Sequence, residues 1–289
     1  MEQALSFLAA AQNHDGGWGY QAGGASFTEP TALGLIAVAG SDAAAAAAKA
    51  TDWLLAGQHD DGGWGALHAD PESAWHTTVA VWGLSAARKA KASGEVAIAV
   101  SRGADWLLAN RSRSLPLPNP ATKLIGRLAG WSWTPGTFGW VIPTGLGLMA
   151  LGAASPGGVP DSASDAVSLL VDRRCSKGGW NWGNPVLFGT ELPPYATETA
   201  IAVLGLLAAG REASDDSVKS GLDWLMSNLD PNTGVTATAW AILALRAGGR
   251  DASSAIARLR GMQASDGGWR ASPHATALAY LALRSGPVL

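Results

Sequence analysis

The sequence predicts an all-α fold, a closed α/α toroid of about six helical hairpins with an inner and an outer ring of helices. Three observations support this prediction. A Gln–Gly-Gly-Trp motif recurs along the chain, amphipathic and entirely apolar helical stretches alternate, and the last repeat is as apolar as the middle ones. Repeated helical hairpins stack as an open solenoid or close into a ring, and an open solenoid needs polar terminal repeats. The apolar last repeat therefore favours the ring.

The first helix of each repeat has a polar face and is expected to lie in the outer ring. Three of these helices end in a Gln that leads to Gly-Gly-Trp, namely Gln12, Gln58 and Gln263, and a fourth has Arg174 in place of the Gln. Two degenerate repeats complete six units. The expected outer-helix segments are 5–11, 50–57, 105–108, 166–173, 223–226 and 255–262.

The second helix of each repeat is apolar on every side, which is typical of a buried helix. Each begins near a shared Thr and continues with Ala, Gly and Leu almost without a charge. These small residues allow the inner helices to approach one another closely. The shared threonines are Thr31, Thr78, Thr144, Thr199, Thr238 and Thr276.

Composition excludes several classes of protein. Only 15% of the residues are charged, which argues against disorder and for a large core, and a net charge of −3 argues against an electrostatic grip on nucleic acid. The single cysteine, Cys175, excludes an intrachain disulfide and a Cys-rich zinc site. A basic leader and a long apolar run are both missing, so neither a signal peptide nor a membrane span is expected. We expect one cytoplasmic domain over residues 1–289, with peripheral membrane contact as a further option.

The Gln–Gly-Gly-Trp repeat resembles the QW motif of squalene–hopene cyclases, and the hairpin pattern resembles the related β subunits of protein prenyltransferases. The segments 130–137 and 179–184 look like those of small bacterial squalene-cyclase-like proteins. The resemblance implies a toroid around an apolar cavity that takes isoprenoid chains. It also implies structural roles for the motif residues Gln12, Trp18, Gln58, Trp64, Trp180, Gln263 and Trp269.

The catalytic signatures of these families are absent. Neither the Asp pair at 60–61 nor that at 215–216 extends to the Asp-x-Asp-Asp run of the squalene–hopene-type cyclases or to Asp-Asp-x-x-Asp. Cys175 lies at an outer-helix end, away from the position of the prenyltransferase zinc ligand, whereas His274 matches that family's His. The resemblance therefore supplies a fold and a cavity without a known acid.

Four residues at the starts of inner helices are the candidate catalytic group. Alignment of the repeats gives Glu29, His76 and His274 equivalent positions, with Glu198 one residue further on. In a closed ring Glu29 would lie between the two histidines, and packed helices lie about 8–10 Å apart. We expect Glu29, aided by His76 and His274, to be a general acid, with Glu198 as the second choice. Two alternatives remain: an open metal site, or purely structural helix capping.

Two long connections, 111–140 and 176–196, are expected on the same rim, where function usually lies. No acidic residue occurs between Asp105 and Asp161, so the first could hold a diphosphate or could be a solvated basic loop. Aromatic residues on the inner helices and in these loops could contact a prenyl chain or a carbocation, or simply pack the core. The basic candidates are Arg111, Arg113, Lys123 and Arg127, and the aromatic ones are Trp75, Trp82, Trp133, Trp140, Trp182, Trp240 and Tyr280, with Trp131 also assigned to a rim loop.

These features predict an isoprenoid-handling protein, foremost a small squalene- or terpene-cyclase-like enzyme with a nonstandard acid. One alternative is a prenyltransferase that uses a prenyl diphosphate and a metal. Another is a non-catalytic toroid that binds an apolar ligand or a protein. The expected partner is an isoprenoid or other apolar small molecule. No cofactor is firmly implied, although a divalent metal is compatible with the sequence.

Overall fold

The computed structural model describes residues 1–90, 94–114 and 124–286. Within them the chain forms twelve α-helices, one 3-10 helix and two short strands. The described residues divide into two compact units, the first made of 1–107 and 256–286 and the second of 108–255. The single domain expected from the sequence stays a prediction.

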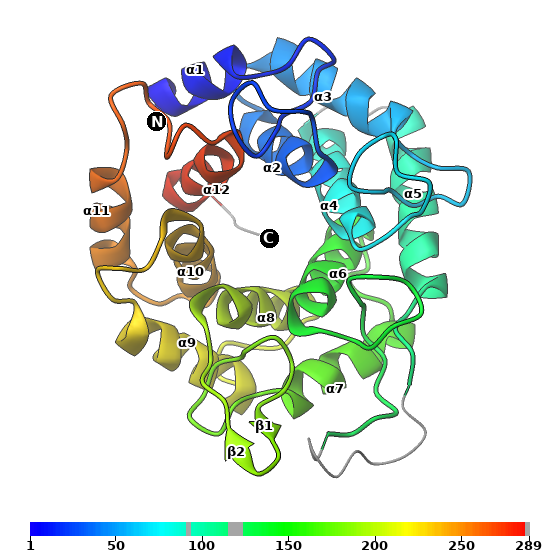
Figure 1. Cartoon of the computed structure of the whole chain (residues 1–289), viewed down its shortest axis with the longest axis vertical. Helices are drawn as coiled ribbons and strands as arrows, with labels where there is room; N and C mark the ends of the chain where they lie inside the picture. Colours follow the sequence, from blue (N-terminus) through cyan, green and yellow to red (C-terminus); the bar gives the residue numbers. More distant parts are fainter. Residues whose placement is uncertain (91–93, 115–123, 287–289) are drawn as a thin grey trace. The chain divides into compact units, whose positions relative to one another are not determined.

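The first unit is built around three neighbouring inner helices. Helix α2 lies between α4 and α12, α1 packs against α12 and α2, and α3 packs against α2 and α4 (Figure 1). The last inner helix thus packs against the first, as the sequence led us to expect. The helices are α1 (Glu2–Ala10), α2 (Thr28–Val38), α3 (Ala44–Ala56), α4 (His76–Ala90), α5 (Gly94–Ala109), α11 (Ser253–Gly261) and α12 (Pro273–Leu283), of which α5 and α11 each have an end in the second unit.

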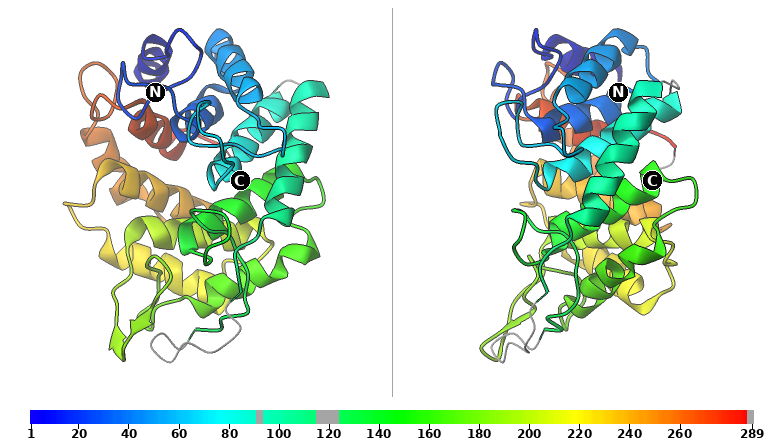
Figure 2. Two further views of the ribbon diagram at one scale, coloured as in Figure 1. Left: turned by 45° about the vertical axis from the view of Figure 1, so that its right-hand side comes forward. Right: turned by 90° about the vertical axis from the view of Figure 1, so that its right-hand side faces the viewer.

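The second unit repeats this arrangement. Helix α8 lies between α6 and α10, while α7 and α9 pack against it, and a small hairpin precedes α8 (Figure 2). The elements are α6 (Val141–Ala154), the 3-10 helix η1 (Asp161–Ala163), α7 (Ser164–Asp172), β1 (Val186–Leu187), β2 (Thr190–Glu191), α8 (Ala196–Ala208), α9 (Asp216–Asn228) and α10 (Val235–Ala247).

Small residues bring the inner helices together. Nearly every residue of α2, α6 and α8 is buried, as their apolar sequences predict. A Cβ built at Gly205 would lie 2.7 Å from the Cα of Gly145, so only glycine fits where α8 meets α6. None of the helices in the described ranges combines the length and apolar character needed to cross a membrane.

The motif tryptophans join each outer helix to the inner helix that follows. The backbone N–H of Trp18 donates to the Thr31 hydroxyl at 2.9 Å, and its indole donates to the Leu8 carbonyl at 2.8 Å. Trp64, Trp180 and Trp269 make both bonds in the same way. Each Trp is thereby fixed between two helices, which explains why the motif recurs.

Two assignments made from the sequence are wrong in detail. The Trp64 N–H donates to the hydroxyl of Thr77 rather than to that of Thr78. The repeat alignment is therefore shifted by one residue in the second repeat. His76 is equivalent in position to Glu198 and not to Glu29. Trp131 belongs with the motif tryptophans, because it is buried and its N–H donates to the Thr144 hydroxyl at 3.0 Å.

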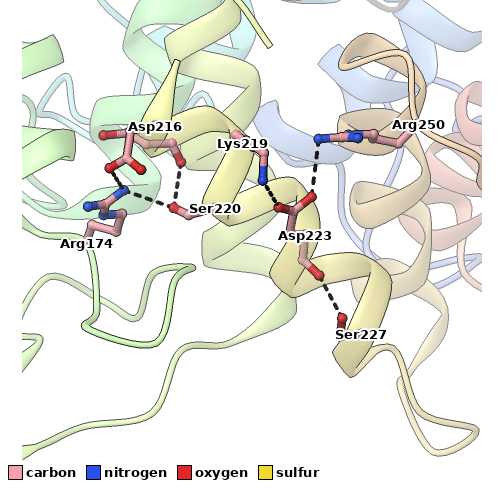
Figure 3. A network of polar contacts seen from close by, with 8 residues as sticks. Arg174, Asp216, Lys219, Ser220, Asp223, Ser227 and Arg250 are labelled. Atoms are coloured by element: carbon pink, nitrogen blue, oxygen red, sulfur yellow. Dashed lines mark hydrogen bonds and ion pairs between the residues drawn. The ribbon is translucent and has the colours of Figure 1, made fainter. Parts of the chain in front are cut away.

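The motif Gln residues link successive outer helices. The Gln12 amide donates to the Ala46 carbonyl of α3, and Gln58 donates to Ala99 of α5, both at 2.9 Å. In the second unit Arg174 takes over this role through an ion pair with Asp216 of α9, at 2.6 Å (Figure 3). The substitution of Arg for Gln therefore keeps the link and changes its chemistry.

Helix α9 is also held from its other side. Lys219 pairs with Asp223 at 2.6 Å along the helix, and Arg250, which follows α10, reaches the same carboxylate at 3.2 Å (Figure 3). These groups lie near the surface, so each pair contributes little singly. Their arrangement ties the chain that follows α7 and the chain that follows α10 to one outer helix.

Candidate functional site

A largely buried carboxylate with two polar partners lies at the N-terminus of α2 in the first unit. The Tyr20 hydroxyl donates to Glu29 Oε2 at 2.5 Å, and His274 Nε2 lies 3.3 Å from Oε1. The Tyr20 and His274 rings are themselves in contact, with centroids 5.3 Å apart. We call these three residues the Glu29 cluster.

Three loops hold the cluster in place. Ser272 caps α12, and its hydroxyl donates to the Tyr20 carbonyl at 2.5 Å. The Ala22 N–H donates to the carbonyl of Ala271, which adopts a left-handed conformation with φ 51°. The Thr28 N–H donates to the Ala66 carbonyl at 2.8 Å. Glu29 is thus fixed by backbone from the loops that precede α2, α4 and α12.

The surroundings of Glu29 favour its ionised form. Burial acts to raise the pKa of this carboxyl, but His274, the Tyr20 hydroxyl and His76 act against it and leave the pKa below its usual value. The helix N-terminus favours the negative charge as well. In turn, burial and the neighbouring Glu29 raise the pKa of Tyr20, which keeps its hydroxyl protonated as a donor.

His76 lies near this cluster without joining it directly. Its ring packs against Trp75, with centroids 4.3 Å apart, and its Nδ1 is buried without a hydrogen-bond partner. Burial lowers the pKa of His76 despite the opposing charges of Glu29 and Asp70, so the ring is neutral near pH 7.

Of the predicted group, the structure therefore brings Glu29 and His274 into contact and leaves His76 beside them. The sequence reasoning missed Tyr20, whose hydroxyl makes the shorter contact with Glu29. Tyr20 lies in a loop outside the repeated positions, two residues after the motif Trp18, so the repeat alignment carried no signal for it.

Glu198, at the N-terminus of α8 in the second unit, has the opposite character. Its side chain is buried, and burial raises the pKa of the carboxyl in spite of favourable interactions with its own backbone N–H and with Trp182. Burial therefore favours the neutral acid. A neutral carboxyl is the form that a proton donor must have.

The pKa shift of Glu198 has a consequence for stability. Between the ordinary value of 4.5 and the raised value, the folded protein binds more protons than the unfolded chain, so its contribution to stability falls as the pH rises. We expect the wild-type free energy of unfolding, minus that of Glu198→Gln, to decrease from about pH 4 to pH 7. Urea denaturation at stepped pH values measures this difference. A difference that stays constant with pH would contradict the shift.

Among the basic candidates, Arg111 is already engaged by its own unit. Its guanidinium donates to the carbonyls of Ser162 and Ala129 and lies 5.4 Å from the centre of the Trp131 ring. Arg113 and Arg127 are exposed, and Lys123 lies outside the described residues. The contacts of Arg111 are those of a residue that fixes the start of the long loop.

The aromatic candidates fall into two groups. Trp82 and Trp240 are buried in inner helices, whereas Trp75, Trp140 and Tyr280 are partly exposed. Trp133 and Trp182 are exposed in the long loops of the second unit. A contact with a prenyl chain is compatible with the partly exposed group and stays a prediction for all of them.

In the described part of the chain, three or more His, Cys, Asp or Glu side chains nowhere gather in a way that could hold a metal ion. His274 is paired with Glu29, and Cys175 is buried at the end of an outer helix.

Neither a family model nor a curated protein matches the sequence, but solved structures do. A variant of the type II terpene cyclase MstE from Scytonema, in complex with its substrate geranylgeranyl dihydroxybenzoate, has a TM-score of 0.67 at 17% identity, over 98% of this chain and 95% of that chain. The chain has the all-α, toroid-like fold of this terpene cyclase. The predicted fold class is thereby confirmed.

Other similar structures are those of different proteins. A protein from Actinoplanes matches with a TM-score of 0.64 at 21% identity, over 98% of this chain and 97% of that chain. A glycosidase variant matches with a TM-score of 0.66 at 12% identity, over 98% and 94%. At such identities the likeness establishes the fold alone. The activity has to be argued from the side chains.

Proposed function

We propose that this protein is a terpene-cyclase-like enzyme that binds a prenylated small molecule and transfers protons at the Glu29 cluster. The observation that carries the proposal is a largely buried carboxylate held between a phenol and an imidazole at the start of an inner helix. Further support comes from the fold, which this chain shares with a type II terpene cyclase bound to a geranylgeranylated substrate.

Cyclisation of a prenyl chain requires both a proton donor and a proton acceptor. A proton adds to an alkene, whose π electrons form the new C–H bond and leave a carbocation, and the last cation loses a C–H proton to a base. The net reaction is an isomerisation. Because its pKa is lowered, Glu29 suits the acceptor and can also stabilise positive charge along the chain.

This assignment differs from the expectation that Glu29 is the general acid. We assign His274 the role of orienting Glu29 and relaying its proton, and Tyr20 the role of holding the second carboxylate oxygen. Glu198, in the second unit, has the raised pKa that a proton donor needs, and it stays a separate candidate that is not assigned to the Glu29 cluster.

Glycoside hydrolysis fits the Glu29 cluster less well, although glycosidases share the fold. Glycosidases generally use a pair of Asp or Glu residues that flank the scissile bond. The groups that set the pKa of Glu29 are two histidines and a tyrosine, so the described residues supply imidazole and phenol where that reaction needs a second carboxyl.

An assay in D₂O tests the proposal. Purified protein is incubated with a geranylgeranylated hydroxybenzoate, with squalene, and with farnesyl or geranylgeranyl diphosphate, and the extracts are analysed by mass spectrometry against boiled protein. We expect an isomer of the hydroxybenzoate compound or of squalene that carries a single deuterium, because the added proton comes from an exchangeable group. Release of diphosphate would favour the prenyltransferase alternative. Bound but unchanged substrate would favour a non-catalytic binding protein.

A further inference from the structure

The hairpin before α8 ends in an unusual turn. Strands β1 and β2 pair through Val186 with Glu191 and Leu187 with Thr190, which leaves Phe188 and Gly189 as the two turn residues. Their φ angles are 49° and 79°, so both central residues are left-handed. Two-residue turns of this kind favour Asn-Gly or Asp-Gly, and a bulky residue at positive φ is disfavoured. The backbone conformation of the turn therefore does not explain why a Phe occupies position 188.

Burial gives no reason for it either. Phe188 is 81% exposed, the highest exposure among the large hydrophobic residues in the described ranges, and the neighbouring Leu187 is also exposed. A side chain that is both conformationally disfavoured and in contact with water requires another explanation, because strain of this kind tends to occur where it serves function.

Amphipathic aromatic residues lie at the foot of the hairpin. Trp182 is 60% exposed, and its ring lies 5.3 Å from the ring of the exposed Tyr195. The Leu192 N–H donates to the Pro185 carbonyl at 2.9 Å. This bond closes the base of the hairpin, so the two aromatic rings lie on one side of it and the Phe188 turn on the other. Phe and Leu at a tip with Trp and Tyr behind is the order found across the boundary between acyl chains and headgroups of a membrane.

The long connection 111–140, which precedes α6, adds positive charge. The Val141 N–H, at the start of α6, donates to the Trp182 carbonyl at 3.1 Å, so the end of this connection lies beside the segment before the hairpin. Arg113 and Arg127 of this loop are exposed, and the sequence has no acidic residue between Asp105 and Asp161. Exposed basic residues are attracted to an anionic lipid surface, and here two of them stand against one exposed carboxylate in the hairpin, Glu191.

We propose that the Phe188 hairpin docks the second unit onto an anionic lipid surface, with Phe188 and Leu187 entering the acyl boundary and Trp182 and Tyr195 at headgroup level. A lipid surface fits better than a protein partner, because a stable protein interface buries about 1,000 Å² or more, whereas a narrow turn inserts on its own. Docking at a membrane is separate from the proposed chemistry and would supply an enzyme of this kind with apolar substrate.

The variant Phe188→Asn separates docking from folding. Asn-Gly suits this turn better than Phe-Gly, so the variant should fold with an unchanged or higher Tm. The probe is co-sedimentation with vesicles of phosphatidylcholine alone or mixed with phosphatidylglycerol. We expect the wild type to bind the mixed vesicles, and Phe188→Asn to lower this partitioning at least about tenfold. The matched control is Ile98→Asn, because Ile98 on α5 is 63% exposed but lies far from the hairpin in sequence, in the first unit.

A second variant tests the charge. Reversing Arg113 and Arg127 together to Glu should reduce binding on mixed vesicles to the level on neutral ones. Absence of wild-type binding to mixed vesicles, or equal binding by Phe188→Asn, would overturn the proposal. So would a Phe188-dependent self-association in vesicle-free sedimentation, which would assign the tip to a second copy of the chain. Turnover of detergent-dispersed substrate should be the same in Phe188→Asn and wild type, so a failure here leaves the proposed activity untouched.

Discussion

Replacing Glu29 with Gln is expected to lower turnover of a prenylated substrate at least about a hundredfold. The amide keeps the size of the side chain and can still hydrogen-bond with Tyr20 and His274, but it cannot accept a proton or carry negative charge. The measurement is the rate of formation of the deuterated isomer under saturating substrate. The matched control is Glu72→Gln, which alters an exposed carboxyl in the same unit.

The pH dependence adds a readout that a structural role would not change. If Glu29 must be ionised, turnover falls as the pH drops through its lowered pKa. Tyr20→Phe removes a hydrogen bond to the ionised carboxylate, so the acidic limb should move to higher pH. Turnover by Glu29→Gln within about threefold of wild type would mean that the cluster only fixes the loops.

Replacing Trp180 with Ala is expected to reduce the free energy of unfolding by about 3–5 kcal/mol. The side chain is fully buried, its N–H donates to the Thr199 hydroxyl, and its indole donates to the Leu170 carbonyl at 2.6 Å. Truncation leaves a cavity between α7 and α8 and an unsatisfied carbonyl. Denaturant titration followed by circular dichroism measures the loss.

The same loop supplies the control for this change. Trp182, two residues further on, is largely exposed, and Trp182→Ala should change the free energy of unfolding by no more than about 1 kcal/mol. If Trp180→Ala does not fold, Trp180→Phe fills most of the volume and should lose about 1–3 kcal/mol with the indole bond. Equal effects at positions 180 and 182 would contradict the role assigned to the motif tryptophans.

Much of the fold was predictable because the same helix pattern and the same motif recur in successive repeats. A helix that is apolar on every side is stable only when it is buried. A motif that recurs at helix ends marks the junction between an outer helix and the inner helix that follows it. The contact of Glu29 with His274 followed from the same reasoning, since the first and last inner helices had to be neighbours. These features depend on patterns that each repeat reinforces.

The two errors of assignment arose where a single repeat departs from the common pattern or allows two alignments. Thr77 and Thr78 are adjacent, and only the structure shows which hydroxyl meets Trp64. Trp131 lacks the first glycine of the motif, where Ala129 stands, yet its separation of 13 residues from Thr144 equals that of Trp18 from Thr31. That spacing was the signal that could have identified it.

The protonation states were beyond sequence reasoning for a physical reason. Glu29 and Glu198 occupy similar places at inner-helix starts, and burial acts in the same direction on the pKa of both. The opposite outcomes come from partners, since Glu29 has His274 and the loop residue Tyr20 beside it. The contacts that decide such a balance are set by tertiary structure.

The Glu29 cluster also sets a condition on synthesis of the protein. Its histidine is separated from its carboxylate by 245 residues, and the loop that holds Tyr20 is bonded to the one before α12. A nascent chain on the ribosome therefore lacks the cluster until His274 has been translated. Helices α1 to α4 can pair earlier through local contacts, but the loop around Tyr20 must wait for the segment before α12. The Glu29 cluster thus forms only once α12 is available, and a chain terminated before α12 would have a carboxylate without its imidazole.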